Sequence, residues 1–163
     1  MSYYSLEPPV STSLTNSPSP LLVVPDSPYR IRRFVETFAK HFRREFAYDF
    51  VPFEAAETPT TLGYIPYEAY LFHEVARDLL APDYPVKHRC FGACVFRRVE
   101  CENAPACWSL QWVWLHPYFR NRGYLSEIWP EFIQKYGSFN VELPLSAAME
   151  KFLEKKRHIQ QQT

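Results

Sequence analysis

The sequence lacks an excess of charge of either sign. Lysine plus arginine and aspartate plus glutamate both number 18 in the 163 residues, so the formal net charge is +0. A protein that binds nucleic acid or an anionic membrane surface through its overall field normally carries a basic excess. The balance disfavours both kinds of partner. A single-stranded nucleic-acid binder remains as an alternative because of the rings and arginines at Trp112, Trp114, Tyr118 and Arg120.

Long apolar runs are also absent. No segment approaches the roughly 18 consecutive apolar residues of a membrane-spanning helix, although 47% of the residues are hydrophobic. The first residues lack the cationic start and the unbroken apolar core of a secretory signal peptide. We therefore expect a cytoplasmic protein with no membrane partner, and a chain of this length fits one domain.

The four cysteines lack the spacing of a zinc site. Cys90, Cys94, Cys101 and Cys107 do not form the CxxC pairs from which zinc knuckles are built. Cys90 and Cys94 lie in an apolar run that is typical of a strand, where cysteine packs as a small hydrophobe. We therefore predict no metal, and reduced thiols in or near the core.

Serine and proline dominate the first 20 residues, which carry little charge. Such a segment buries too little apolar surface to offset its ordering entropy, so we predict a flexible arm over residues 1–20 and a single domain over residues 21–163. Within the domain we expect strands at 21–24, 67–75, 89–99, 107–115 and 138–143, and helices at 26–46, 123–137 and 147–158.

This order of elements predicts the fold class. Three consecutive strands form an antiparallel meander, and the later strand-helix-strand crossover adds a parallel neighbour. We predict an α/β, or α+β-like, fold with a mixed, mostly antiparallel sheet and helices on both faces. The helix at 26–46 has one apolar face that includes Phe38, Phe42 and Phe46. Pro130 predicts a kink or a break in the helix at 123–137.

The segment from Leu115 to Ser126 is a candidate anion site. A strand ends there, the chain turns at Gly123, and a helix begins. Such a turn offers unpaired N–H groups and the positive end of a helix dipole. Gly123 lets the backbone approach a phosphate, and Arg120 and Arg122 can neutralise its charge. From the residues alone, a basic surface turn between a core strand and a core helix remains the alternative.

The same segment resembles the central motif of the GNAT superfamily, the acyl-CoA-dependent N-acyltransferases. Leu115-His116-Pro117 corresponds to the family's V-x-P-like strand end, and residues 120–125 correspond to its Q/R-x-x-G-x-G/A turn. The resemblance implies a GNAT fold without the usual C-terminal strands and acetyl-CoA as co-substrate. It assigns coenzyme binding to Leu115, His116, Arg120, Asn121, Arg122, Gly123, Tyr124, Leu125 and Ser126.

By the same resemblance, the reaction would be acetyl transfer to an amine, either a protein lysine or a small molecule. The stretch 'PACWSLQWV' is similar to a part of the cohesin acetyltransferases, which implies a lysine acceptor. The Leu115 N–H, with Trp114 and His116 adjacent, would polarise the thioester carbonyl. The candidates for moving protons are Glu142, His116 and Ser146, with Glu74, His73, Tyr124 and water as alternatives.

Three positions depart from the family pattern. Leu125 replaces a small residue, Gln111 lies near where some members have a glutamate, and Phe152 occupies a position that is often tyrosine. These departures favour the main alternative, a catalytically inactive interaction module with the same fold. The acceptor side would be completed by the segment 29–66 or by a second subunit in a homodimer.

Overall fold

The computed structural model describes residues 7–101, 104–142 and 146–161. The strands form one open sheet in the order β2-β3-β4-β5-β6, and β1 pairs with β4. The strands are β1 (Val10–Ser11), β2 (Leu21–Val23), β3 (Tyr67–Val75), β4 (His88–Cys101), β5 (Ala104–Leu115) and β6 (Asn140–Val141). The helices are α1 (Tyr29–Phe46), α2 (Tyr124–Tyr136) and α3 (Ala147–Gln161), with short 3-10 turns η2 (Arg77–Leu79) and η3 (Pro117–Phe119).

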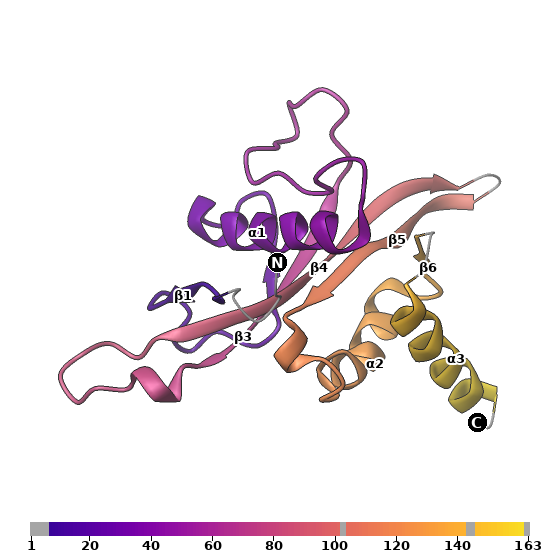
Figure 1. The fold of residues 1–163 in the computed structure, drawn as a ribbon. Helices are drawn as coiled ribbons and strands as arrows, with labels where there is room; N and C mark the ends of the chain where they lie inside the picture. The colour runs from indigo at the N-terminus through magenta and orange to yellow at the C-terminus, as the bar shows by residue number, and fades with distance from the viewer. Residues whose placement is uncertain (1–6, 102–103, 143–145, 162–163) are drawn as a thin grey trace.

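The predicted fold class is confirmed. Strands β3, β4 and β5 form the antiparallel meander, and β6 joins β5 as a parallel neighbour after the α2 crossover. Helix α1 covers one face of the sheet, and α2 and α3 lie on the other (Figure 1). The end of the predicted last strand, at residues 143–145, lies outside the described residues.

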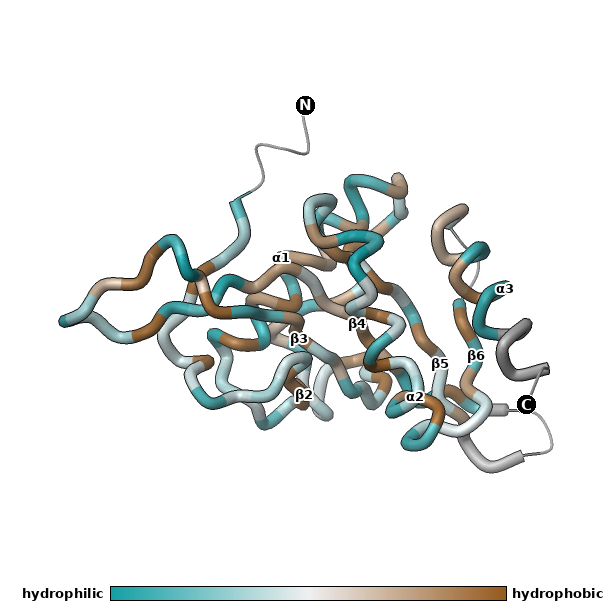
Figure 2. The backbone as a smooth tube through the Cα atoms, turned by 90° about the horizontal axis from the view of Figure 1, so that it is seen from below, coloured by the Kyte–Doolittle hydropathy of each residue, from teal (hydrophilic) through white to brown (hydrophobic). Residues whose placement is uncertain are grey.

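The sheet separates two hydrophobic cores, because buried residues of β3, β4 and β5 contribute to both of them. Hydrophobic residues recur along these central strands (Figure 2). On the α1 face, Phe38 stacks on Trp114 with ring centroids 5.7 Å apart. On the α2 face, Phe96 stacks on Tyr136 at 4.2 Å. The alternation of side chains along each strand, with period two, sends consecutive apolar residues to opposite cores.

Helix α2 continues through Pro130, so the predicted break of the helix at this proline is wrong. Proline removes one backbone hydrogen bond from the helix. Trp129 and Phe132, on either side of the proline, are both buried in the core on the α2 face of the sheet. Tertiary packing therefore keeps the helix in one piece.

Residues 7–20 differ from the predicted flexible arm. Val10 and Ser11 pair with β4, and Leu14 is 1% exposed within the α1-side core. The composition of the segment did not predict this packing, because composition does not show which single residues are buried. One buried leucine and a two-residue strand are enough to hold the segment against the sheet. Residues 1–6 of the predicted arm lie outside the described residues.

The cysteine prediction is correct for two residues and wrong for a third. Cys90 and Cys94 are free thiols in the two cores, and burial raises the pKa of both. Cys107 is disulfide-bonded instead of reduced. The Cys101 side chain lies outside the described residues.

A buried histidine pair ties the N-terminal segment to the sheet. His73 Nε2 donates to the Pro18 carbonyl at 2.8 Å, and His73 Nδ1 lies 3.0 Å from His88 Nδ1. Burial lowers the pKa of His73, and the neighbouring His88 lowers it further, whereas the hydrogen bond to Pro18 opposes the shift. Folding therefore favours the neutral imidazole.

We expect this pair to make the protein less stable in mild acid. The pKa of His73 is lower in the folded chain than its ordinary value of about 6.5, so the unfolded chain binds more protons between the two values. The free energy of unfolding should fall as the pH drops below about 6.5. Urea unfolding at pH 7.5 and pH 5.5 measures this loss, which should be smaller in His73→Gln. An equal loss in both proteins would contradict the assignment.

Gly92 allows β4 to approach the end of β5. A Cβ atom at this position would lie 2.7 Å from the Trp114 carbonyl oxygen and 3.0 Å from Leu115 Cα. Both are backbone atoms, which cannot rotate away. We expect Gly92→Ala to lower the free energy of unfolding by about 1–3 kcal/mol through this overpacking, measured by urea denaturation. An unchanged free energy of unfolding would show that the end of β5 can move away from β4 at no cost, and would contradict the prediction.

Candidate functional site

Strands β5 and β6 separate to form a fork at the edge of the sheet. In the described residues, β6 pairs with β5 only at Ser109 and Leu110, and the Glu142 N–H donates to the Leu110 carbonyl at 2.9 Å. Gln111 then forms a bulge, because Val95 pairs with Trp112 while the next β4 residue pairs with Leu110. A bulge bends the strand that carries it. Beyond Gln111, β5 continues to Leu115, and in the described residues this part of the strand pairs with β4.

The bulge turns the amide of Leu115 toward the open side of the fork. The His116 N–H donates to the Phe91 carbonyl of β4 at 2.7 Å. Successive residues of a strand direct their amides to opposite sides, so Leu115 and Val113 face away from β4, whereas Trp114 faces it. Of the three predicted donors, only Leu115 therefore directs its N–H into the fork.

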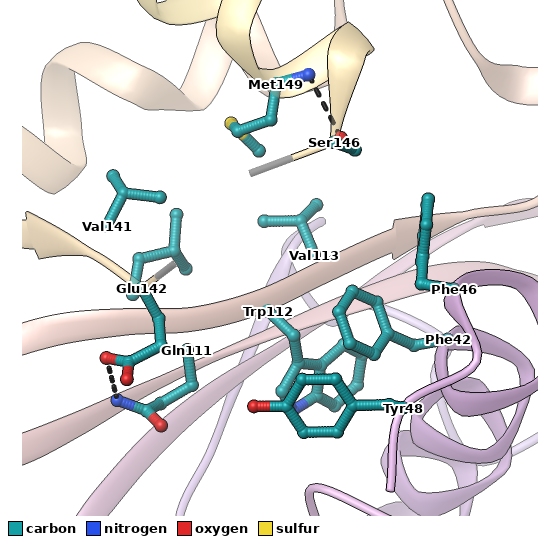
Figure 3. A pocket seen from close by; sticks show the side chains of 11 residues that line it. Phe42, Phe46, Tyr48, Gln111, Trp112, Val113, Val141, Glu142, Ser146 and Met149 are labelled. Atoms are coloured by element: carbon teal, nitrogen blue, oxygen red, sulfur yellow. Dashed lines mark hydrogen bonds between the residues drawn. The ribbon is translucent and has the colours of Figure 1, made fainter. Parts of the chain in front are cut away.

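A cavity of about 170 Å³ lies in the fork (Figure 3). Strand β5 forms its floor, the first turn of α3 lies above it, and the end of α1 closes one side. Its lining residues are Phe42, Phe46, Tyr48, Leu110, Gln111, Trp112, Val113, Val141, Glu142, Ser146 and Met149.

Two of the three predicted proton-transfer residues line this cavity. Glu142 Oε2 accepts from Ser109 Oγ at 3.2 Å and from Gln111 Nε2 at 3.3 Å. Ser146 caps α3, because its Oγ accepts from the Met149 N–H at 3.1 Å. The carboxylate is therefore held from one side, and Gln111, which cannot act as a base itself, orients it.

His116 lies away from these two residues. Its Nδ1 accepts from the Tyr118 N–H at 3.1 Å, and its ring lies 6.3 Å from that of Trp114. It caps the turn that follows β5 and is not among the residues that line the cavity. The alternatives on β3 are engaged elsewhere, since His73 is paired with His88 and Glu74 accepts from the Tyr124 hydroxyl.

The predicted anion turn begins α2 as expected from the glycine. Gly123 is the N-cap, with φ of 84°, a conformation that costs other residues free energy. In the described structure no side chain caps this helix, so the amides of its first turn remain for another acceptor. Asn121 also has a positive φ, 61°, and the exposed guanidinium of Arg122 lies 4.2 Å from the Tyr118 ring.

Arg120 has a different environment from the one predicted. Its guanidinium contacts the two Glu45 carboxylate oxygens at 2.6 and 3.1 Å, and its Nε donates to the Leu115 carbonyl at 2.8 Å. It also lies over the Trp114 ring. Its charge is thus already paired, which leaves Arg122 as the cation of the turn that an anion could reach without breaking an ion pair.

The large residue at position 125 packs away from the turn. Leu125 contacts the core beneath the sheet. Tyr124 packs on Phe91 with centroids 4.6 Å apart, and its hydroxyl lies 3.5 Å from Glu74 Oε2. The Leu125 side chain therefore adds its bulk to this core.

The aromatic wall of the cavity was not predicted from the sequence. Phe42 and Phe46 belong to the apolar face of α1, and such a face is typical of a core helix, but Phe46 is 40% exposed at the end of that helix. Ala47 ends the helix with φ of 51°, and the reversed chain brings the Tyr48 ring 5.5 Å from that of Phe42. The spacing of Phe42 and Phe46 along the helix is the same as that of core residues, so the sequence could not show that their rings line a cavity.

Among the described residues, no group of three or more histidine, cysteine or acidic side chains is placed to hold a metal ion. In the same residues, no helix combines the length and the apolar character needed to cross a membrane. No protein-family model matches the chain, and no curated protein matches it.

Proposed function

We propose that this protein is an acetyl-CoA-dependent N-acetyltransferase of the GNAT type, acting on an amine acceptor. The observation that carries the proposal is the fork between β5 and β6, with an outward-facing Leu115 amide at one end and a cavity at the other. The uncapped start of α2 follows Leu115 after a short turn. One continuous edge therefore joins the predicted anion site to the cavity.

The distance along this edge suits an elongated ligand. From Leu115 to Gln111 the strand spans about 13 Å, at roughly 3.3 Å per residue. A ligand that binds both places needs an anionic group at one end and a long arm that ends at the cavity. Acetyl-CoA has this form, with its phosphates separated from the thioester by an extended chain.

The residues of the fork suggest roles in the transfer. The Val113 N–H, which faces away from β4 beside the cavity, would donate to the thioester oxygen as negative charge develops there, and the Leu115 N–H would bind the arm that leads to the phosphates. The amine attacks the carbonyl carbon and gives a proton to Glu142, and the C–S bond then breaks with departure of the thiolate. The thiolate takes its proton from water or from Ser146, whose hydroxyl can donate while its oxygen accepts from the Met149 N–H.

Isothermal titration of the protein with acetyl-CoA, followed by an assay of a panel of amines, tests the proposal. We expect saturable binding and transfer of the acetyl group to at least one amine. Absence of binding would contradict it. Normal binding with no transfer to any amine would instead favour the inactive module of the same fold, which the pairing of Arg120 with Glu45 also favours.

A further inference from the structure

We propose that Glu45 is a positioning residue of the fork. It lies in the last turn of α1 and is not among the residues that line the cavity. It acts through Arg120, which holds the end of β5 in place. This inference rests on the proposed function and adds to its site a residue that lies far from the motif at 115–125.

Both oxygens of the Glu45 carboxylate are held. Oε1 accepts from Arg120 Nη2 at 2.6 Å and from the Trp114 indole N–H at 3.1 Å, and Oε2 accepts from Arg120 Nη1 at 3.1 Å. The side chain of Glu45 is 15% exposed and that of Arg120 is 34% exposed. A two-point contact between arginine and a carboxylate fixes the plane of the guanidinium as well as its position. The remaining nitrogen, Nε, is therefore held in one direction.

This nitrogen is directed at the end of β5. Arg120 Nε donates to the Leu115 carbonyl oxygen at 2.8 Å. The N–H and the C=O of one residue in a strand lie on the same side, and the Leu115 N–H faces away from β4. The arginine therefore approaches the strand from the open side of the fork. It satisfies the carbonyl group there and leaves the neighbouring N–H for a ligand.

Trp114 ties the same carboxylate to the core. It is 2% exposed and stacks on Phe38 of α1, and the Arg120 guanidinium lies 5.4 Å from the centroid of its ring. Glu45 directly precedes Phe46, which lines the cavity. The contacts of this one carboxylate thus hold both the end of β5 and the part of α1 that supplies the aromatic wall.

A competing role for Glu45 makes the opposite prediction. If it served only to withhold Arg120 from a phosphate, its removal would free a cation beside the turn and strengthen anion binding. The Trp114 indole argues against this role. Its N–H is buried, so departure of the carboxylate would leave a donor without its acceptor, which costs free energy. The ion pair is therefore built to persist when a ligand binds.

Glu45→Gln and Glu45→Ala form a matched pair of variants. The glutamine oxygen can take the place of Oε1 and keep two of the three hydrogen bonds without the charge, whereas alanine keeps none. In calorimetry, we expect the Kd for acetyl-CoA to rise by about tenfold or more in Glu45→Ala and by about threefold or less in Glu45→Gln. Equal Kd values in the two variants, or tighter binding in either, would overturn the inference.

The route through Arg120 has its own test. If Glu45 acts through this arginine, the double variant Glu45→Ala/Arg120→Ala should bind acetyl-CoA about as weakly as Arg120→Ala alone, because residues that act as one unit are not additive. Losses that multiply in the double variant would show that Glu45 acts by another route and would overturn the inference. Thermal denaturation checks that each variant is folded.

A further measurement does not depend on the coenzyme. In backbone NMR spectra of the free protein, the amide signals of Leu115 and His116 should shift or broaden in Glu45→Ala and stay near their wild-type positions in Glu45→Gln. The reason is that the Leu115 carbonyl and the His116 N–H belong to one peptide group. Unchanged signals in Glu45→Ala would overturn the positioning role. Absence of acetyl-CoA binding by the wild type would instead contradict the proposed function, and the NMR comparison would still decide the role of Glu45.

Discussion

Gly123→Glu is expected to weaken acetyl-CoA binding by about 100-fold or more. The substitution acts in two ways, and both follow from the position of Gly123 as the N-cap of α2. Its φ of 84° is unfavourable for a residue with a side chain, so the turn must distort. The new carboxylate would also compete with phosphate oxygens for the amides at the start of the helix. A 100-fold loss corresponds to about 2.7 kcal/mol of binding free energy.

Gly63→Glu is the matched control for this substitution. Gly63 also has a positive φ, 77°, and a Cβ atom there, as at Gly123, would have no neighbour within 4 Å. It belongs to the long loop between α1 and β3, outside the predicted coenzyme site. Calorimetry should show near-normal affinity in Gly63→Glu and lost affinity in Gly123→Glu. Similar affinities in the two variants, both folded by circular dichroism, would place the phosphates elsewhere.

Glu142→Gln is expected to lower kcat by about 100-fold or more, because general-base catalysis typically contributes that much. The amide has nearly the same shape and can still accept from Ser109 and Gln111, but it cannot take a proton from the attacking amine. The affinity for acetyl-CoA should remain unchanged, because the predicted coenzyme residues lie beyond the other end of the fork. Quenched time-course assays of acetylation measure kcat, and calorimetry measures the affinity for acetyl-CoA.

Glu150→Gln provides the comparison for this variant. Glu150 is exposed in the first turn of α3 and does not line the cavity, so its loss should leave kcat near the wild-type value. Near-normal kcat in Glu142→Gln would reject Glu142 as the base and direct attention to His116 or to water. A reduced kcat in both variants would indicate a general charge effect.

Much of the secondary structure could be predicted because it depends on local patterns. Strand β3 has the predicted bounds, Tyr67–Val75, and the strand-turn-helix arrangement around Gly123 follows from a short run of residues. The mixed sheet follows in turn from the order of the elements. Pro130 shows the limit of such reasoning, because a local rule predicts a break that packing on both sides of the proline prevents.

The sequence by itself determined the order of the elements, the mixed sheet and the turn at Gly123, since periodicity and turn chemistry act over a few neighbouring residues. Only the tertiary structure decided the pairing of Arg120 with Glu45, the fork created by the bulge at Gln111, and the aromatic wall from α1. These features join residues 30 to 75 positions apart or depend on strand register. The physical reason is that tertiary packing decides which surfaces lie next to each other once the sheet is complete. This packing determines which residue pairs with Arg120 and how exposed the aromatic rings of α1 are.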